Sequence, residues 1–230
     1  MKNIIFYLLL STLIVSCIGD DIIDDMVDEQ LRITMMPEVI AAGETFQFEA
    51  RFTNNVGLVE EGRVIWSSSD ESLLTINQDG LATALQQGSV TVSATVTLEG
   101  KEPLLELIPI TIGGSGTTVV AEEVSSARSG TIETTTFYTL EGDFTLEEQD
   151  DGKLLLSIAE NYETTSALPG LYLYLTNNPN TTNGAFEIGR VDIFEGAHTY
   201  EIEGVELNDF DYLLYFCKPF RVKVGDGKIN

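Results

Sequence analysis

The chain has few side chains that are able to carry out covalent or metal chemistry. Its 230 residues include two cysteines, Cys17 and Cys217, and one histidine, His198. The patterns H-E-x-x-H, C-x-x-C and G-x-S-x-G do not occur in the sequence, so we predict no catalytic constellation and no metal site. A nucleophile and base formed by Cys217 and His198 would require the fold to bring the two together.

Cys217 lies in an aromatic segment that runs from Tyr212 to Phe220. In a regular strand Tyr215 and Cys217 would share one face, and Lys218 would lie on the other. A nearby cation favours the reactive thiolate, whereas an apolar setting keeps a thiol inert. Strand parity does not say which face is the core. Cys217 is therefore a small buried hydrophobe, a redox-active or ligating thiol with Lys218 and Tyr215 as neighbours, or a link to another molecule.

The first 16 residues predict a secretory signal. Lys2 precedes an apolar run from Ile4 to Val15, which is too short to cross a bilayer as a helix. The run ends in Ile14-Val15-Ser16-Cys17, which resembles the bacterial lipobox. The resemblance implies cleavage before Cys17 and lipid attachment to its thiol; the alternative is that Cys17 only ends an ordinary signal. With Cys17 lipidated, Cys217 has no disulfide partner within the chain.

Acidic and apolar pairs alternate directly after the lipobox, which predicts a lipidated, flexible acidic tether over residues 17–30. An acidic cluster behind a lipidated cysteine resembles the export signal of Bacteroidota lipoproteins. The resemblance implies an outer-membrane lipoprotein exposed on the cell surface. The formal net charge of −25 becomes −26 when Lys2 leaves with the signal. Nucleic acid is therefore not expected as a partner, and anionic membrane surfaces are poor ones.

Residues 31–113 show the period-two alternation of an antiparallel β-sandwich. We expect strands over Leu31 to Thr34, Thr45 to Thr53 and Val90 to Leu98, among others. Trp66 is the only tryptophan and is flanked by β-branched residues, so it is expected to anchor the core.

This segment resembles the group 2 bacterial Ig-like domain. The resemblance is carried by Ile65-Trp66-Ser67-Ser68-Ser69-Asp70, by Gly80-Leu81-Ala82-Thr83-Ala84, and by the valine-rich strand that follows Gly88. It implies a spacer or adhesion module with no chemistry of its own.

A glycine-rich stretch begins at Gly113 and predicts a linker over residues 114–127, with independent movement of the two halves. From residue 128 to 230 the β alternation resumes with more tyrosine, phenylalanine and glycine. No long amphipathic helix is indicated. The predicted fold class is therefore all-β, with two β-sandwich domains behind the signal and the tether.

The C-terminal half resembles the electron-transfer DM-thirteen domain. The matching segments, in chain order, are Leu140-Glu141-Gly142-Asp143-Phe144-Thr145-Leu146, Leu168-Pro169-Gly170-Leu171-Tyr172-Leu173-Tyr174-Leu175, Gly196-Ala197-His198-Thr199-Tyr200-Glu201-Ile202, and Tyr215-Phe216-Cys217-Lys218-Pro219-Phe220. The resemblance implies an extracellular β-domain with a proposed redox role that is centred on Cys217. It names no cofactor, and it implies an extracellular redox protein as partner.

Two functional hypotheses follow. The first is a non-enzymatic surface lipoprotein, held in the outer membrane by Cys17, whose C-terminal domain uses Cys217 as a redox group or cofactor ligand. The second is an adhesion module that binds a surface glycan or protein, with Cys217 only in the core. For the second hypothesis, Tyr172, Tyr174 and Tyr200 are candidates for a carbohydrate-stacking surface, although alternating aromatics in strands also serve as core.

Overall fold

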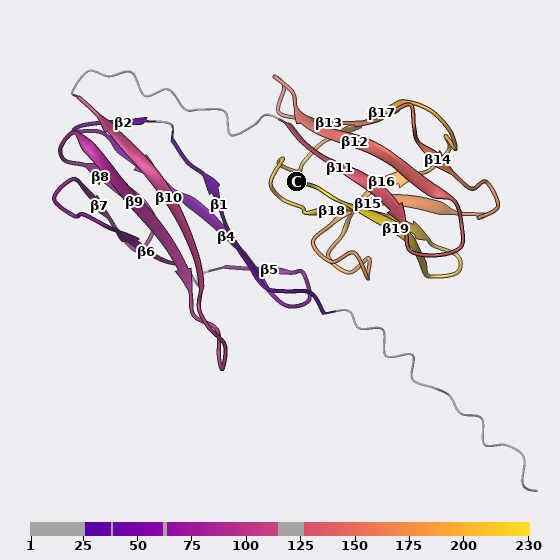
Figure 1. Ribbon diagram of the computed structural model, residues 1–230, viewed down its shortest axis with the longest axis horizontal. Coiled ribbons are helices and arrows are strands. Elements are labelled where there is room, and N and C mark those ends of the chain that lie inside the picture. The colour runs from indigo at the N-terminus through magenta and orange to yellow at the C-terminus, as the bar shows by residue number, and fades with distance from the viewer. Residues whose placement is uncertain (1–25, 38, 62–63, 115–126) are drawn as a thin grey trace, which may run out of the picture.

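The computed structural model describes residues 26–37, 39–61, 64–114 and 127–230 (Figure 1). Every strand or helix assigned in this part of the chain is a β-strand, which confirms the predicted all-β class. The described ranges contain no helix that is long and apolar enough to span a membrane. Cys17, most of the acidic tether and nearly all of the linker lie outside the described residues.

Ten strands form the N-terminal domain. They are β1 (Gln30–Met35), β2 (Val39–Ala41), β3 (Thr45–Gln47), β4 (Glu49–Thr53), β5 (Val59–Glu60), β6 (Ile65–Ser68), β7 (Leu74–Ile76), β8 (Leu81–Ala84), β9 (Gly88–Val96) and β10 (Leu104–Gly113). They make three sheets with the strand orders β1-β4-β5, β2-β10-β9-β6 and β3-β8-β7. The pairing of β2 with β10 is parallel, and the other pairings in these sheets are antiparallel.

Strand β9 shows how the sequence builds the N-terminal core. Val90, Val92, Ala94 and Val96 alternate with hydroxyl residues, and all four are buried. Trp66 on the neighbouring β6 is 6% exposed and belongs to the same core cluster as the first three. The prediction that Trp66 anchors this core is confirmed.

The segment from Thr45 to Thr53 is two strands rather than the single strand predicted. The chain changes sheets at Phe48, because β3 pairs with β8 whereas β4 pairs with β1. The Phe48 N–H donates to the carbonyl of Gly80 at 2.9 Å, and its ring packs 5.9 Å from that of Trp66. We infer that burying the Phe48 ring in the core stabilises the domain more than one continuous strand from Thr45 to Thr53 would.

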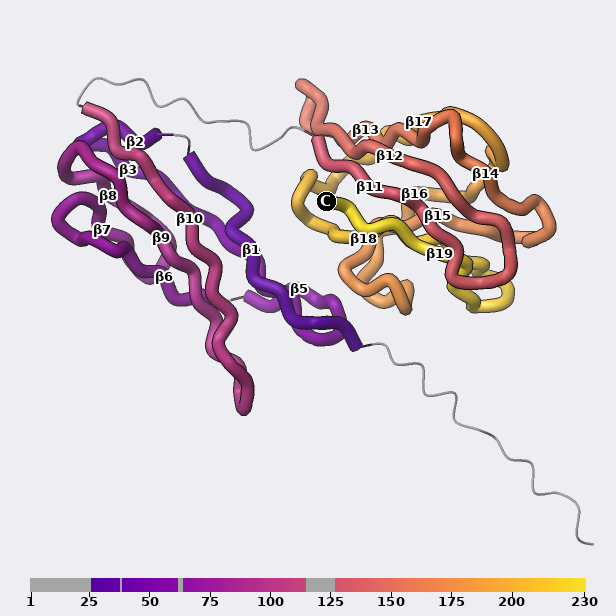
Figure 2. The backbone as a smooth tube through the Cα atoms, in the orientation of Figure 1, coloured from indigo at the N-terminus to yellow at the C-terminus, as the bar shows by residue number. Residues whose placement is uncertain are grey.

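Nine strands form the C-terminal domain. They are β11 (Ala127–Thr134), β12 (Leu140–Glu148), β13 (Leu154–Ile158), β14 (Glu163–Thr164), β15 (Leu171–Thr176), β16 (Phe186–Arg190), β17 (His198–Ile202), β18 (Tyr212–Cys217) and β19 (Val222–Lys228). They belong to one antiparallel sheet in the order β16-β15-β18-β19-β11-β12-β13-β17, with β14 paired to β12. Figure 2 shows this sheet curling around its own core until it is nearly closed.

Glycines allow β11 and β19 to approach closely where the sheet curls. A Cβ added to Gly225 would lie 2.6 Å from Leu140 Cδ2 and 2.9 Å from Thr134 Cα, and closer still to the carbonyl oxygen of Glu133. Such distances are far below van der Waals contact. Only glycine fits here, and the curvature of the domain depends on it.

Candidate functional site

Cys217 lies in the core of the C-terminal domain. It is opposite Leu171 on β15 and Val222 on β19. Its exposure is 0%, and Leu213 and Tyr215 on the same face of β18 belong with it to one apolar cluster. In the folded state the thiol is closed off from solvent, so it has no access to a soluble oxidant or to another molecule. The structure therefore favours the alternative in which Cys217 is a packing residue.

The two predicted neighbours of the thiol lie on opposite sides of the strand. Tyr215 is 1% exposed and shares the core face with Cys217. Lys218 points outward, where its Nζ lies 2.5 Å from the Glu187 carboxylate and 3.9 Å from the centroid of the Tyr172 ring. Lys218 therefore does not supply the cation that would favour a thiolate in the core.

We expect Cys217 to react with iodoacetamide at least about a hundredfold more slowly in the native protein than in urea, because a fully buried thiol reacts only when the structure opens. Mass spectrometry of the peptide containing Cys217 measures the rate. A Phe220→Cys variant is the matched control, since Phe220 is 63% exposed three residues away and its replacement should react at the rate of an accessible thiol. Equal rates for Cys217 in native and unfolded protein would restore the redox hypothesis.

Tyr215 also belongs to a buried aromatic cluster that the sequence did not indicate. The Tyr162 ring centroid lies 6.1 Å from that of Tyr215 and 5.0 Å from that of His198, whose ring in turn lies 5.4 Å from that of Tyr200. Burial raises the pKa of Tyr162 and of Tyr215 well above the usual value for a phenol, so both are neutral at neutral pH. His198 Nδ1 lies 2.9 Å from the carbonyl oxygen of Gly196, and the ring is held among tyrosines rather than paired with Cys217.

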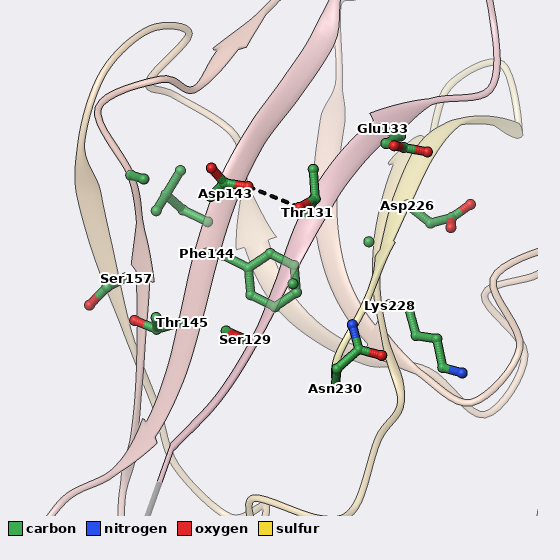
Figure 3. A pocket seen from close by; sticks show the side chains of 14 residues that line it. Ser129, Thr131, Glu133, Asp143, Phe144, Thr145, Ser157, Asp226, Lys228 and Asn230 are labelled. Atoms are coloured by element: carbon green, nitrogen blue, oxygen red, sulfur yellow. Dashed lines mark hydrogen bonds between the residues drawn. The ribbon is translucent and has the colours of Figure 1, made fainter.

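A polar trough with a volume of about 690 Å³ crosses the outer face of the C-terminal domain (Figure 3). Short hydroxyl side chains and longer charged ones from four adjacent strands line it. They include Ser129, Thr131 and Glu133 on β11, Asp143 and Thr145 on β12, Ser157 on β13, and Asp226 and Lys228 on β19. These groups offer hydrogen-bond donors and acceptors, and Phe144 and Ile158 add apolar surface between them.

Asp143 is the most firmly positioned group in the trough. Its carboxylate accepts hydrogen bonds from Thr131 Oγ1 and from Asn161 Nδ2, each at 2.9 Å. The Asp143 N–H donates to Asn161 Oδ1 at 3.1 Å. Within the described residues no group of three or more histidine, cysteine, aspartate or glutamate side chains is arranged to hold a metal ion. The positioned Asp143 carboxylate and the hydroxyls around it make the trough a candidate surface for binding.

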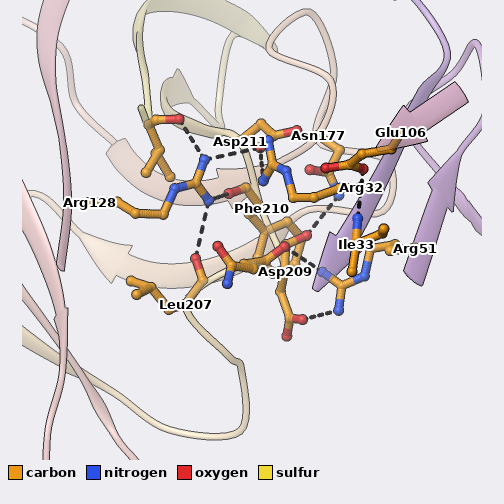
Figure 4. A network of polar contacts seen from close by, with 12 residues as sticks. Arg32, Ile33, Arg51, Glu106, Arg128, Asn177, Leu207, Asp209, Phe210 and Asp211 are labelled. Carbon is orange, nitrogen blue, oxygen red and sulfur yellow. Dashed lines mark hydrogen bonds and ion pairs between the residues drawn. The ribbon is translucent and has the colours of Figure 1, made fainter. Parts of the chain in front are cut away.

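A network of arginines and aspartates joins the two domains (Figure 4). Asp211 of the C-terminal domain is 5% exposed, and its Oδ1 lies 2.7 Å from Arg32 Nη1 of the N-terminal domain and 3.2 Å from Arg128 Nη2 of its own domain. Arg51 on β4 pairs with Asp209 and also donates to the carbonyl of Asn208 at 2.7 Å.

The guanidinium of Arg128 fixes the loop that carries these aspartates. It donates to the carbonyls of Leu207, Phe210 and Ile229 at 3.2, 3.0 and 2.6 Å. Burial lowers the pKa of Arg128, and the charge of Arg32 lowers it further, while Asp211 opposes both effects. Asp211 thus compensates two arginines from two domains at once.

The β4–β5 turn forms a second contact between the domains. The carbonyl of Val56 accepts a hydrogen bond from Asn178 Nδ2 at 3.2 Å. A Cβ added to Gly57 would lie 2.7 Å from the Asn178 Cβ, so the turn backbone lies directly on the C-terminal domain. The glycine-rich linker predicted independent movement of the two domains, and these contacts disagree with that prediction. Side-chain pairing across the interface restrains the relative orientation of the domains even where the linker is flexible.

The three tyrosines considered for carbohydrate stacking do not form one surface. Tyr172 and Tyr174 both lie on β15, under Lys218, whose Nζ is 3.9 and 5.9 Å from their ring centroids. Tyr174 is only 5% exposed. Tyr200 lies on β17 at the other end of the strand order and packs against the core.

Residues 30–104 match the family model described as bacterial Ig-like domain (group 2). The N-terminal domain is thus similar to group 2 bacterial Ig-like domains over residues 30–104, as the sequence resemblance predicted. A solved structure, described as the crystal structure of an EHEC O157:H7 intimin mutant, is 19% identical over 36% of this chain and 46% of that chain, with a TM-score of 0.25. The chain therefore spans less than half the length of that protein. No curated protein matches the chain.

Proposed function

We propose that the chain is a surface lipoprotein, anchored through Cys17, that binds an extracellular glycan or protein and catalyses no reaction. The single observation that carries this proposal is the ion-paired junction of Arg32, Arg51, Asp209 and Asp211. A spacer that is fixed to the domain it carries presents that domain in one orientation. Such presentation serves binding at a surface.

The polar trough is the candidate binding surface in this proposal. It is open, and it is lined by hydroxyls, carboxylates and one lysine together with the apolar Phe144 and Ile158. Ligands with many hydroxyl or amide groups, which glycans and extended peptides both have, match such a lining. The redox role that the DM-thirteen resemblance suggested becomes secondary, since Cys217 is 0% exposed and any electron exchange would have to occur through the packed core.

We expect the purified protein to bind at least one member of a broad panel of glycans and extracellular proteins. A Thr145→Arg substitution, which places a long side chain in the trough, should weaken that binding at least tenfold, a loss of roughly 1.4 kcal/mol. Thr75→Arg, at an exposed position of β7 in the N-terminal domain, is the matched control and should leave binding unchanged. Isothermal titration of each variant measures the effect. Absence of any ligand on the panel, or equal loss in both variants, contradicts the assignment.

A further inference from the structure

Three exposed apolar side chains gather at one end of the C-terminal domain. Phe137 in the β11–β12 turn is 90% exposed, Phe220 in the β18–β19 turn is 63% exposed, and Val222 is 43% exposed. The two turns are tied together, because the Thr135 N–H donates to the carbonyl of Val224 at 3.0 Å. Figures 1 and 2 show them at the same end of the domain. We refer to Phe137, Phe220 and Val222 as the apolar tip.

The backbone that presents the apolar tip is strained. Arg221, between Phe220 and Val222, has a φ of 54°, and it is the only non-glycine residue with positive φ in the part of the chain that the structure describes. An arginine in this conformation lowers the stability of the turn, and the exposed rings beside it add nothing to the core. A strained turn with exposed Phe220, tied to a second turn with exposed Phe137, indicates an interaction surface.

Basic side chains surround the apolar tip in an otherwise acidic protein. Three of the 12 basic residues of the chain, Lys218, Arg221 and Lys223, fall within six positions. Lys218 pairs with Glu187 and Lys223 with Asp226, so these two cations and their acids balance. Arg221, beside Phe220, is then the basic side chain of this turn without an ion pair among the described residues. Aromatic rings with neighbouring basic groups suit the headgroup region of a bilayer.

In the view of Figure 1 the described chain begins on the lower side of the molecule, between the two domains, and the β18–β19 turn lies on the same lower side at the far end of the C-terminal domain. The Val27 N–H donates to the carbonyl of Asn55 at 2.9 Å, which holds this end against the turn that touches the C-terminal domain. Only the chain between Cys17 and Met26 separates it from the proposed lipid, and an extended chain of that length reaches about 30 Å at most. The anchored molecule is therefore held close to the bilayer with its apolar tip on that side.

We propose that the apolar tip inserts into the boundary between headgroups and acyl chains of the membrane that holds Cys17. This inference rests on the lipid anchor of the proposed function. Insertion gives the protein two attachments to the membrane, the acyl chains and the tip. With two attachments, the two domains keep a fixed tilt relative to the membrane instead of reorienting freely on the tether.

Depth-dependent quenching tests the proposal. The acylated full chain is reconstituted into phosphatidylcholine vesicles with brominated acyl chains, in variants Phe137→Trp and Phe220→Trp. Native Trp66 is 6% exposed in the Ig-like core, and its emission is subtracted by means of the wild-type protein. We expect bromolipid to remove about half or more of the emission of each added tryptophan, because aromatic side chains settle at the depth of the interface.

Leu85→Trp is the control, since Leu85 is exposed on the Ig-like domain between β8 and β9 and should not be quenched. Protein that stays with the vesicles on flotation but shows no quenching at Phe137→Trp and Phe220→Trp overturns the insertion of the tip. The protein is produced with its signal in a bacterium that processes lipoproteins, and a mass of the Cys17 peptide without acyl chains overturns the lipid anchor of the proposed function instead. The two failures are thus distinguished in one sample.

Discussion

Replacing Asp211 by alanine is expected to lower the free energy of unfolding of the C-terminal domain by about 3 kcal/mol, since it leaves a buried arginine without its counter-ion. The Arg128 side chain is 10% exposed and that of Asp211 is 8% exposed, so solvent screens their interaction little. Arg32 is 34% exposed and contributes less. We also expect the two domains to separate, because Asp211 is shared between them.

The aromatic residues allow each domain to be followed separately. The only tryptophan, Trp66, is in the Ig-like domain, whereas the described tyrosines all lie in the C-terminal domain. Urea unfolding followed by near-ultraviolet circular dichroism of tyrosine should shift in Asp211→Ala, and the fluorescence of Trp66 should shift much less.

Asp209→Ala is the matched control for this experiment. Asp209 pairs with Arg51, and both side chains are about a fifth exposed, so we expect a loss of about 1 kcal/mol or less. Equal losses in Asp209→Ala and Asp211→Ala would contradict the central position given to Asp211. Small-angle scattering that shows no change in the separation of the domains in Asp211→Ala would contradict its role as a shared counter-ion.

Substitution of Gly225 by alanine is expected to destabilise the C-terminal domain by about 3 kcal/mol, since the added methyl group has no space between β19 and β11. The nearest obstacles are backbone atoms of Glu133 and Thr134, which do not move without distorting the sheet. Thermal unfolding followed through tyrosine dichroism measures the loss, and a failure to give soluble protein points in the same direction.

Gly204→Ala is the control that distinguishes a steric clash of the added methyl group from strain in the backbone. Gly204 has a φ of +80° and no atom within 4 Å of an added Cβ, so its substitution costs only the backbone strain, about 1 kcal/mol. If Gly225→Ala proved no worse than Gly204→Ala, the close approach of β11 and β19 would not be needed for the fold.

The alternation of apolar and polar residues predicted where the strands lie better than it predicted which face of each strand is in the core. Val90 to Leu98 could be assigned because one face is apolar and the other carries hydroxyls, and β9 follows that pattern. In β18 the pattern is uninformative, since Leu213 and Leu214 are both 0% exposed although they point to opposite faces. Parity therefore did not locate the thiol of Cys217.

The junction between the domains and the trough had no signal in the sequence. Arg51 and Asp209 are ordinary charged residues 158 positions apart, in a chain with 37 acidic side chains. The trough depends on which small polar residues of four strands become neighbours, and that is set by sheet order. The resemblance to bacterial Ig-like domains predicted the N-terminal fold because Trp66 and the turns around it are local features.

The position of Arg32 determines how tension passes through the molecule. Arg32 lies on β1, the first strand after the tether, and pairs directly with Asp211 of the C-terminal domain. Under the proposed function, a ligand on the C-terminal domain that is pulled away from the cell loads the N-terminal end of the chain through Arg32 on β1, Arg51 on β4 and the β4–β5 turn. This path does not include β6 to β10, so the sheets that these strands form carry little load until the junction contacts break. Mechanical strength under flow is then set by the junction.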